Sequence, residues 1–202
     1  MGGAVASGLL AYGGGQYQIT VANPSAAPLE KLKADGAAVT HDNREACSDA
    51  DIVIVAVKPW IVETVFNEIY ERQSIVVIAA GLTGVQLSSW LEKDGKTPWL
   101  LIVMPNTAMA VARSMTFVVP VNASASLVSE VTAMFDCLGE TMVIDEAHLP
   151  AATALASCGI AYAMRYVRAA VEGGVELGFK AAAAQKMVVQ TLRGAAALLD
   201  EP

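Results

Sequence analysis

Small polar side chains follow the predicted second strand of the chain, in the turn Asn23-Pro24-Ser25. In doubly wound nucleotide-binding folds this turn holds the adenosine ribose, and NAD-specific proteins place Asp or Glu there to bind both ribose hydroxyls. Asn and Ser are neutral donors, so this turn would tolerate a 2′-phosphate. The alternative is an ordinary Asx-type turn, in which the Asn side chain bonds nearby backbone.

Further polar groups stand where predicted strands or helices end. Lys58 follows a buried apolar run and is either a solvated lysine or a cation at the edge of a cofactor. Asn106 and Thr107 follow Met104-Pro105, where such residues suit the cap of a following helix. Glu146 precedes the helical tail and is suited to a helix N-terminus.

Neither a metal site nor a strong nucleophile is predicted. His41 and His148 have no Cys or carboxylate at ligand spacing, and no Ser/His/Asp arrangement is visible. Cys158 lies among small residues, which favours packing over nucleophilic chemistry. The chain therefore offers no catalytic acid or base.

Three apolar runs must position these groups. Residues 52–57 are six consecutive apolar residues that end at Lys58-Pro59, and residues 74–81 and 100–107 repeat the pattern. Continuous apolar runs indicate strands buried on both faces of a parallel sheet. Their ends form the carboxyl edge of the sheet, which is where open α/β sheets bind ligands.

The flanking segments complete a doubly wound α/β pattern. Expected helices cover 1–10, 29–34, 43–50, 60–72, 84–93 and 126–138; the shorter strands cover 17–23, 39–40, 115–121 and 141–145. No strand precedes the first helix, so the fold is predicted without its first strand, which would leave the neighbouring strands without a ladder partner. Of the glycine fingerprint G-x-G-x-x-G, only Gly2 remains, as its third glycine.

The tail of the chain is predicted to be helical and to associate. Helices are expected over 153–172 and 181–199, with a break at 173–178, and many of their apolar residues have no obvious partner. A helical dimer interface is the natural interpretation. The predicted division is a Rossmann-like domain at 1–146 and an all-α dimerisation domain at 147–202.

Composition excludes several classes of protein. The net charge of −7 over 202 residues, without a basic cluster, argues against nucleic-acid binding. Three widely spaced cysteines fit neither a disulfide framework nor a zinc site and favour a reducing compartment. No apolar stretch reaches the ~20 residues of a membrane span, and no secretory signal is recognised, so a cytoplasmic protein is expected.

Four segments together resemble pyrroline-5-carboxylate reductase. They are Ala56-Val57-Lys58-Pro59, Ala79-Ala80-Gly81, Val103-Met104-Pro105-Asn106-Thr107 and Gly174-Val175-Glu176-Leu177-Gly178, in order and at the right separations. The resemblance covers essentially the whole chain. It implies a Rossmann-like domain followed by a helical dimerisation domain, and NAD(P)H-dependent reduction of 1-pyrroline-5-carboxylate to L-proline.

The resemblance also implies site residues. NADPH, with NADH possible, would contact Gly2, Asn23, Ser25, Asn43, Ala56, Val57, Lys58, Pro59, Ile78, Ala79, Ala80, Met104 and Pro105. The substrate would contact Asn106, Thr107 and Glu146. Hydride transfer to a protonated imine needs orientation more than acid–base help. The implied partner is a second copy, in a dimer or larger ring.

The chain departs from the family pattern in three places. It has no counterpart of the first strand and the first two glycines of the phosphate loop, nor of the C-terminal S-P-G-G-T segment. The family's S-G-S-G-P-A-Y is replaced by Ala156-Ser157-Cys158-Gly159-Ile160-Ala161-Tyr162. Two alternatives stay open: a non-catalytic nucleotide-binding or dimerising module, and an oxidoreductase related to 6-phosphogluconate dehydrogenase, whose catalytic lysine only Lys180 or Lys186 could supply.

Overall fold

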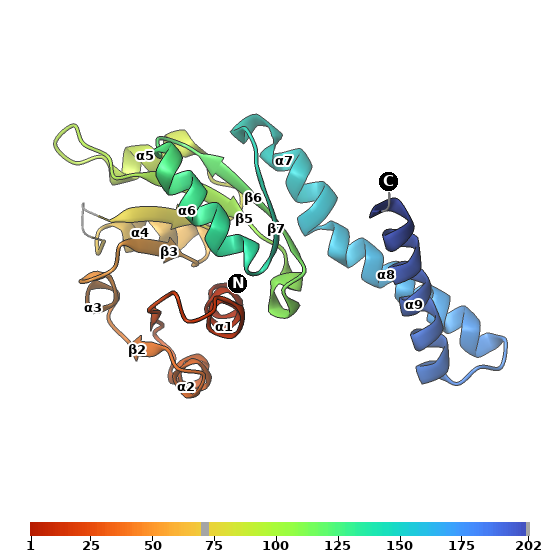
Figure 1. The fold of residues 1–202 in the computed structure, drawn as a ribbon. Helices are drawn as coiled ribbons and strands as arrows, with labels where there is room; N and C mark the ends of the chain where they lie inside the picture. Colours follow the sequence, from red (N-terminus) through yellow and green to blue (C-terminus); the bar gives the residue numbers. More distant parts are fainter. Residues whose placement is uncertain (70–72, 201–202) are drawn as a thin grey trace. The chain divides into compact units, whose positions relative to one another are not determined.

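The computed structural model of the chain describes residues 1–69 and 73–200 (Figure 1). It divides into two compact units, Met1–Ser157 and Cys158–Pro202. The domain boundary predicted at 146/147 lies ahead of this division, at the short 3₁₀ helix η3 (Glu146–His148). Within the described ranges, no helix is long and apolar enough to span a bilayer.

Five strands form the main sheet of the first unit, in the order β3-β4-β5-β6-β7. They are β3 (Ile52–Val55), β4 (Ser74–Val77), β5 (Leu100–Met104), β6 (Ser114–Pro120) and β7 (Gly139–Val143). The strands predicted from the apolar runs are confirmed, and β5 is buried at every position.

The sheet is parallel except where β6 runs antiparallel to β5. Residues 105–113 between these strands contain only the short 3₁₀ helix η2 (Thr107–Val111). A parallel connection needs about a dozen residues or more, so the chain returns antiparallel here. The parallel arrangement predicted for the three apolar runs is confirmed for β3, β4 and β5, and the antiparallel step lies at β6, for which no direction was predicted.

Helices cover both faces of the main sheet because each presents an apolar stripe. One core includes Val62, Phe66, Leu87 and Leu91 of α4 (Val62–Phe66) and α5 (Gly84–Leu91). The opposite core includes residues of α1 (Gly2–Tyr12) and α6 (Ala125–Asp136). The 3₁₀ turn η1 (Pro59–Ile61) precedes α4. The helix predicted over 60–72 is shorter than expected, because α4 ends at Phe66 and residues 67–69 are not helical; residues 70–72 lie outside the described residues.

The two remaining strands form a separate parallel sheet. β1 (Thr20–Ala22) pairs only with β2 (Ala38–Thr40), beside α2 (Ala26–Ala34) and α3 (Asn43–Cys47). Figure 1 shows this group in red and orange beside β3. Among the described residues, β1 and β3 each lack a second ladder partner, which confirms the expectation from the sequence.

The chain leaves the main sheet through a distorted helical stretch. After η3 come α7 (Leu149–Ala152) and the π-helical η4 (Thr153–Ser157). A regular helix beginning at residue 153 was expected, so this stretch differs from the prediction. π-Helical turns are rare and occur often at functional sites.

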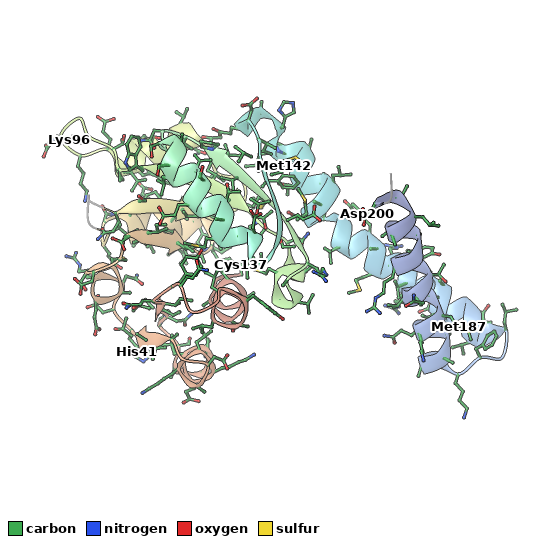
Figure 2. All side chains as sticks on the ribbon, viewed as in Figure 1. His41, Lys96, Cys137, Met142, Met187 and Asp200 are labelled. Carbon is green, nitrogen blue, oxygen red and sulfur yellow. The ribbon has the colours of Figure 1, made fainter. Side chains whose placement is uncertain are left out.

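The second unit is an antiparallel pair of helices, α8 (Gly159–Glu176) and α9 (Ala181–Asp200). The break predicted at 173–178 is wrong in its first part: α8 continues through Gly174, and the chain turns at Gly178, whose φ is +95°. A Cβ on Gly174 would lie 2.9 Å from the Ala184 Cβ, so this glycine allows the helices to approach. Large apolar side chains stay exposed, among them Met187, labelled in Figure 2.

Candidate functional site

The turn after β1 has the Asx geometry that the sequence allowed. Asn23 Oδ1 accepts a hydrogen bond from the Ser25 backbone N–H at 2.8 Å. The Asn23 N–H donates to the Thr40 carbonyl at 3.2 Å, which ties the end of β1 to the end of β2. The Ser25 hydroxyl does not cap α2 and is exposed. The turn is therefore held rigidly while the Asn23 amide NH₂ and the Ser25 hydroxyl remain available.

The loop after β2 lies at the same edge of the small sheet. His41 Nδ1 lies 2.8 Å from the Asn23 carbonyl oxygen. Asp42 caps α3 by accepting from two backbone N–H groups, and Asn43 Nδ2 donates to Glu68 Oε2 at 2.6 Å. The structure thus brings Asn23 and Asn43 to one edge and adds His41 and Glu68. The sequence signal for His41 is its place directly after the short second strand.

The segment from Ala56 to Pro59 follows the end of β3 and lies under the start of α1. A Cβ on Gly2 would be 2.8 Å from the Ala56 Cβ, so only glycine allows this approach. In glycine-rich nucleotide loops the third glycine has this role in helix–strand packing. Lys58 is exposed at the strand end, and Pro59 opens η1.

At the end of β4, mainly backbone groups are accessible to a ligand. Ile78 and Ala79 are buried in the cores on opposite faces of the sheet, while Ala80 is exposed. The Ile78 N–H donates to the Val55 carbonyl at 3.1 Å. A ligand at this edge would therefore meet the Ala80 backbone and methyl rather than the two buried side chains.

Asn106 is buried and holds the loop after β5 in place. Its Oδ1 caps η2 by accepting from the Ala108 N–H at 3.0 Å, as the sequence suggested. Its own N–H donates to Ser114 Oγ at 3.1 Å, and its Nδ2 makes a long contact of 3.5 Å to the Ala156 carbonyl. Ser157 Oγ adds a 3.4 Å contact to the carbonyl of Pro105.

Some side chains of the 104–107 loop are buried and hold the loop in place, and another is exposed and could contact a ligand. Met104, Pro105 and Asn106 are buried, whereas Thr107 is exposed. The π-helical turn η4 lies against this loop through Ala156 and Ser157. The sequence drew attention to residues 156–162 as a departure from a family pattern, but it did not indicate this contact.

Glu146 lies at the N-terminus of α5 and not only at the start of the helical tail. Its Oε1 accepts a hydrogen bond from the Gly84 N–H at 2.8 Å, a position that the positive end of a helix favours. It borders an open cavity of about 450 Å³ with Val85, Ser88 and Val121. No hydrogen bond joins Glu146 to the 104–107 loop within residues 1–69 and 73–200.

The cysteines supply no evident nucleophile. Burial, and then the nearby Glu68 carboxylate, raise the pKa of the Cys47 thiol, so it stays protonated and inert. Cys158 is exposed, contrary to the packing role expected for it. In the described part of the chain, no three His, Cys, Asp or Glu side chains cluster in a way that could hold a metal ion.

This arrangement is typical of the class of oxidoreductases that have an α/β nucleotide-binding domain followed by a helical unit. Residues 1–81 match the family described as NADP oxidoreductase coenzyme F420-dependent. Residues 146–202 match the family described as pyrroline-5-carboxylate reductase dimerisation.

Individual relatives agree with both matches. Pyrroline-5-carboxylate reductase 1 of Dictyostelium discoideum is 36% identical over 220 residues, covering 100% of this chain and 39% of that protein. Reductase 2 of the same organism is 30% identical, covering 98% of this chain and 73% of that protein. The chain thus spans well under half of the first relative and about three quarters of the second.

Solved structures place the fold in the same group. The reductase from Coxiella burnetii superposes with a TM-score of 0.87 at 26% identity, covering 98% of this chain and 76% of the other. The Plasmodium falciparum reductase with NADP bound has a TM-score of 0.88 at 24% identity, which supports the fold alone. This chain belongs to the pyrroline-5-carboxylate reductase family.

Proposed function

We propose that the chain carries out, within its assembly, NAD(P)H-dependent reduction of 1-pyrroline-5-carboxylate to L-proline. The observation that carries the proposal is the approach of Gly2 to Ala56, because it places the start of α1 at the end of β3 as a nucleotide site requires. The neutral Asn23-Pro24-Ser25 turn at the next strand end is compatible with a 2′-phosphorylated ribose.

The residues present fit NADP, which is bound in the solved Plasmodium falciparum reductase. Asn23, Ser25 and Asn43 would hold the adenosine end, and the segments 56–59 and 78–80 would follow the nucleotide along the sheet edge. Met104 and Pro105 would lie near the nicotinamide. When bound, NADPH supplies the hydride.

The rest of the chemistry falls to orientation and charge. A protonated cyclic imine is already electrophilic, so the protein mainly has to orient the ring and exclude water. Thr107 is the exposed hydroxyl of the 104–107 loop, and buried Asn106 keeps that loop in place. Glu146 would offer a carboxylate to the positively charged imine beside the cavity that it borders. We assign no general acid or base.

Assembly and location belong to the same proposal. The exposed apolar side chains of α8 and α9 and the match to a dimerisation family support a homodimer or a larger homo-oligomer. The 1–146 and 147–202 domain division and the cytoplasmic location stay predictions from the sequence.

The activity test follows NADPH absorbance with 1-pyrroline-5-carboxylate, and NADH in parallel. It compares the 202-residue chain with a version extended at both ends by the corresponding segments of the Coxiella relative. Turnover by both chains supports the proposed reaction. Turnover by the extended chain alone also supports it, and shows that the added segments are essential for activity. If neither chain turns over while both bind nucleotide, the non-catalytic nucleotide-binding alternative replaces the proposal.

A matched pair of glycine substitutions tests the cofactor cradle. Gly2→Ala would bring two methyl carbons within 2.8 Å, so α1 must move off Ala56 and NADPH affinity is expected to fall about tenfold. Gly3→Ala meets nothing within 4 Å and should leave affinity unchanged while stabilising α1 by up to about 1 kcal/mol. Nucleotide titration and thermal unfolding of both variants check this; equal NADPH affinities would contradict it.

A further inference from the structure

His41 is attached to the turn that follows β1. The parallel strands β1 and β2 are in register, with Ala22 opposite Thr40, so Asn23 and His41 follow them at the same edge of the sheet. His41 Nδ1 lies 2.8 Å from the Asn23 carbonyl oxygen. In Figure 2, His41 is labelled beside β2. The imidazole is therefore fixed next to the turn where the adenosine ribose is expected.

The contact decides which ring nitrogen is available. A carbonyl oxygen can only accept, so Nδ1 must carry a hydrogen and donate it to Asn23. Nε2 makes no hydrogen bond or ion pair within residues 1–69 and 73–200, and the side chain is exposed. When the ring is protonated, Nε2 becomes a donor and the imidazolium can bind a phosphate by a charge-assisted hydrogen bond.

The charged neighbours of His41 are largely engaged with their own loop. Asp42 accepts from two backbone N–H groups of α3, Glu45 accepts from the Thr40 hydroxyl, and Glu68 accepts from Asn43. Arg44 is a permanent cation in the same loop; it is exposed, and no interaction fixes its side chain in the described part of the chain. The His41 ring is instead held by its contact with the Asn23 carbonyl, and such preorganisation lowers the entropic cost of binding.

We infer that His41 is a specificity-determining residue that recognises the 2′-phosphate of NADPH through Nε2. The inference rests on the proposed function, because it names the group that distinguishes the phosphorylated from the unphosphorylated nucleotide. It also explains how a turn without arginine or lysine, Asn23-Pro24-Ser25, can prefer a ribose that carries a phosphate.

The test measures dissociation constants of NADPH, NADH and adenosine 2′-phosphate by calorimetry for four variants. His41→Asn keeps an amide donor near the Nδ1 position, and so the bond to Asn23, but removes Nε2. His41→Ala removes both groups. Arg44→Ala removes the rival cation, and His148→Asn repeats the first substitution at the other, exposed histidine.

The expected result is a loss of about tenfold in affinity for NADPH and adenosine 2′-phosphate in both His41 variants, with NADH affinity unchanged in His41→Asn. Arg44→Ala and His148→Asn should keep the preference for NADPH. The inference is overturned if His41→Asn binds NADPH like the unmodified chain, or if Arg44→Ala alone removes the preference. If neither the unmodified chain nor its version extended at both ends binds either nucleotide, the proposed function fails as a whole. If nucleotide binds but His41→Asn leaves NADPH affinity unchanged, only the inference about His41 fails.

Discussion

Replacing Asn106 by aspartate is expected to destabilise the protein by about 3 kcal/mol at neutral pH, the cost of a buried charge without a partner. Asn106 is only 5% exposed. The Asp side chain can still accept from the Ala108 N–H, but it loses its donor and turns an oxygen toward the Ala156 carbonyl. The donor contact is long, at 3.5 Å, so desolvation of the carboxylate dominates the expected loss.

The loss should depend on pH in a definite direction. Burial raises the pKa of a carboxyl in the folded state above its value of about 3.9 in the unfolded chain. Below that value both states are protonated and the penalty is absent. As the pH rises above that value, the carboxyl ionises in the unfolded state while it is still protonated in the folded state. The stability of the variant relative to the unmodified chain therefore falls, until the pH has passed the raised folded pKa.

Urea unfolding at a series of pH values measures this difference. Asn67→Asp is a matched control, because Asn67 is exposed and its Nδ2 also donates to a backbone carbonyl, that of Glu63. Its cost should stay below about 1 kcal/mol at every pH. A pH-independent loss at Asn106 would mean that the site is hydrated.

In turnover, Asn106→Asp should lower kcat more than it changes the KM for NADPH, because the loop lies at the proposed nicotinamide end.

Much of the sheet could be predicted because burial on both faces leaves a simple signature. The runs that became β3, β4 and β5 have no polar interruption, and each ends at a turn residue. The capping role of Asn106 was predictable for a similar reason, since it depends on residues two apart in the sequence. Local patterns therefore identified the elements and some of their caps.

Features that depend on distant residues were not predictable from the sequence. The helix α8 continues through Gly174 because Ala184 packs there, while a local pattern of glycines predicted a break. Glu146 accepts a hydrogen bond from the N–H of Gly84, the first residue of α5, which lies 62 residues earlier in the chain. The bond of His41 to Asn23 depends on the register of two short strands. In each case tertiary contacts override or extend a local preference.

Gly139 lies opposite the residue that supports Asn106, and substitution of this glycine should have the largest effect on folding. Gly139 pairs with Ser114 at the start of β6 and β7, and Ser114 Oγ accepts the Asn106 N–H. Gly139 has φ +144°, and a Cβ there would lie 2.1 Å from the Ser114 carbonyl oxygen and 2.3 Å from its nitrogen. Both atoms are backbone in a paired strand, so neither can move without breaking the ladder.

Gly139→Ala is therefore expected to cost at least about 4 kcal/mol, enough to leave most of the chain unfolded or insoluble. Gly95→Ala separates the two contributions, because Gly95 also has a positive φ, +74°, but nothing lies within 4 Å of its Cβ position. That variant should lose only about 1 kcal/mol, the strain of the left-handed backbone. Circular dichroism and urea midpoints of the two variants measure the difference. Equally small losses of stability in the two variants would show that β7 does not pair with β6 in this register. The proposed role of Ser114 in supporting Asn106 would then be contradicted as well.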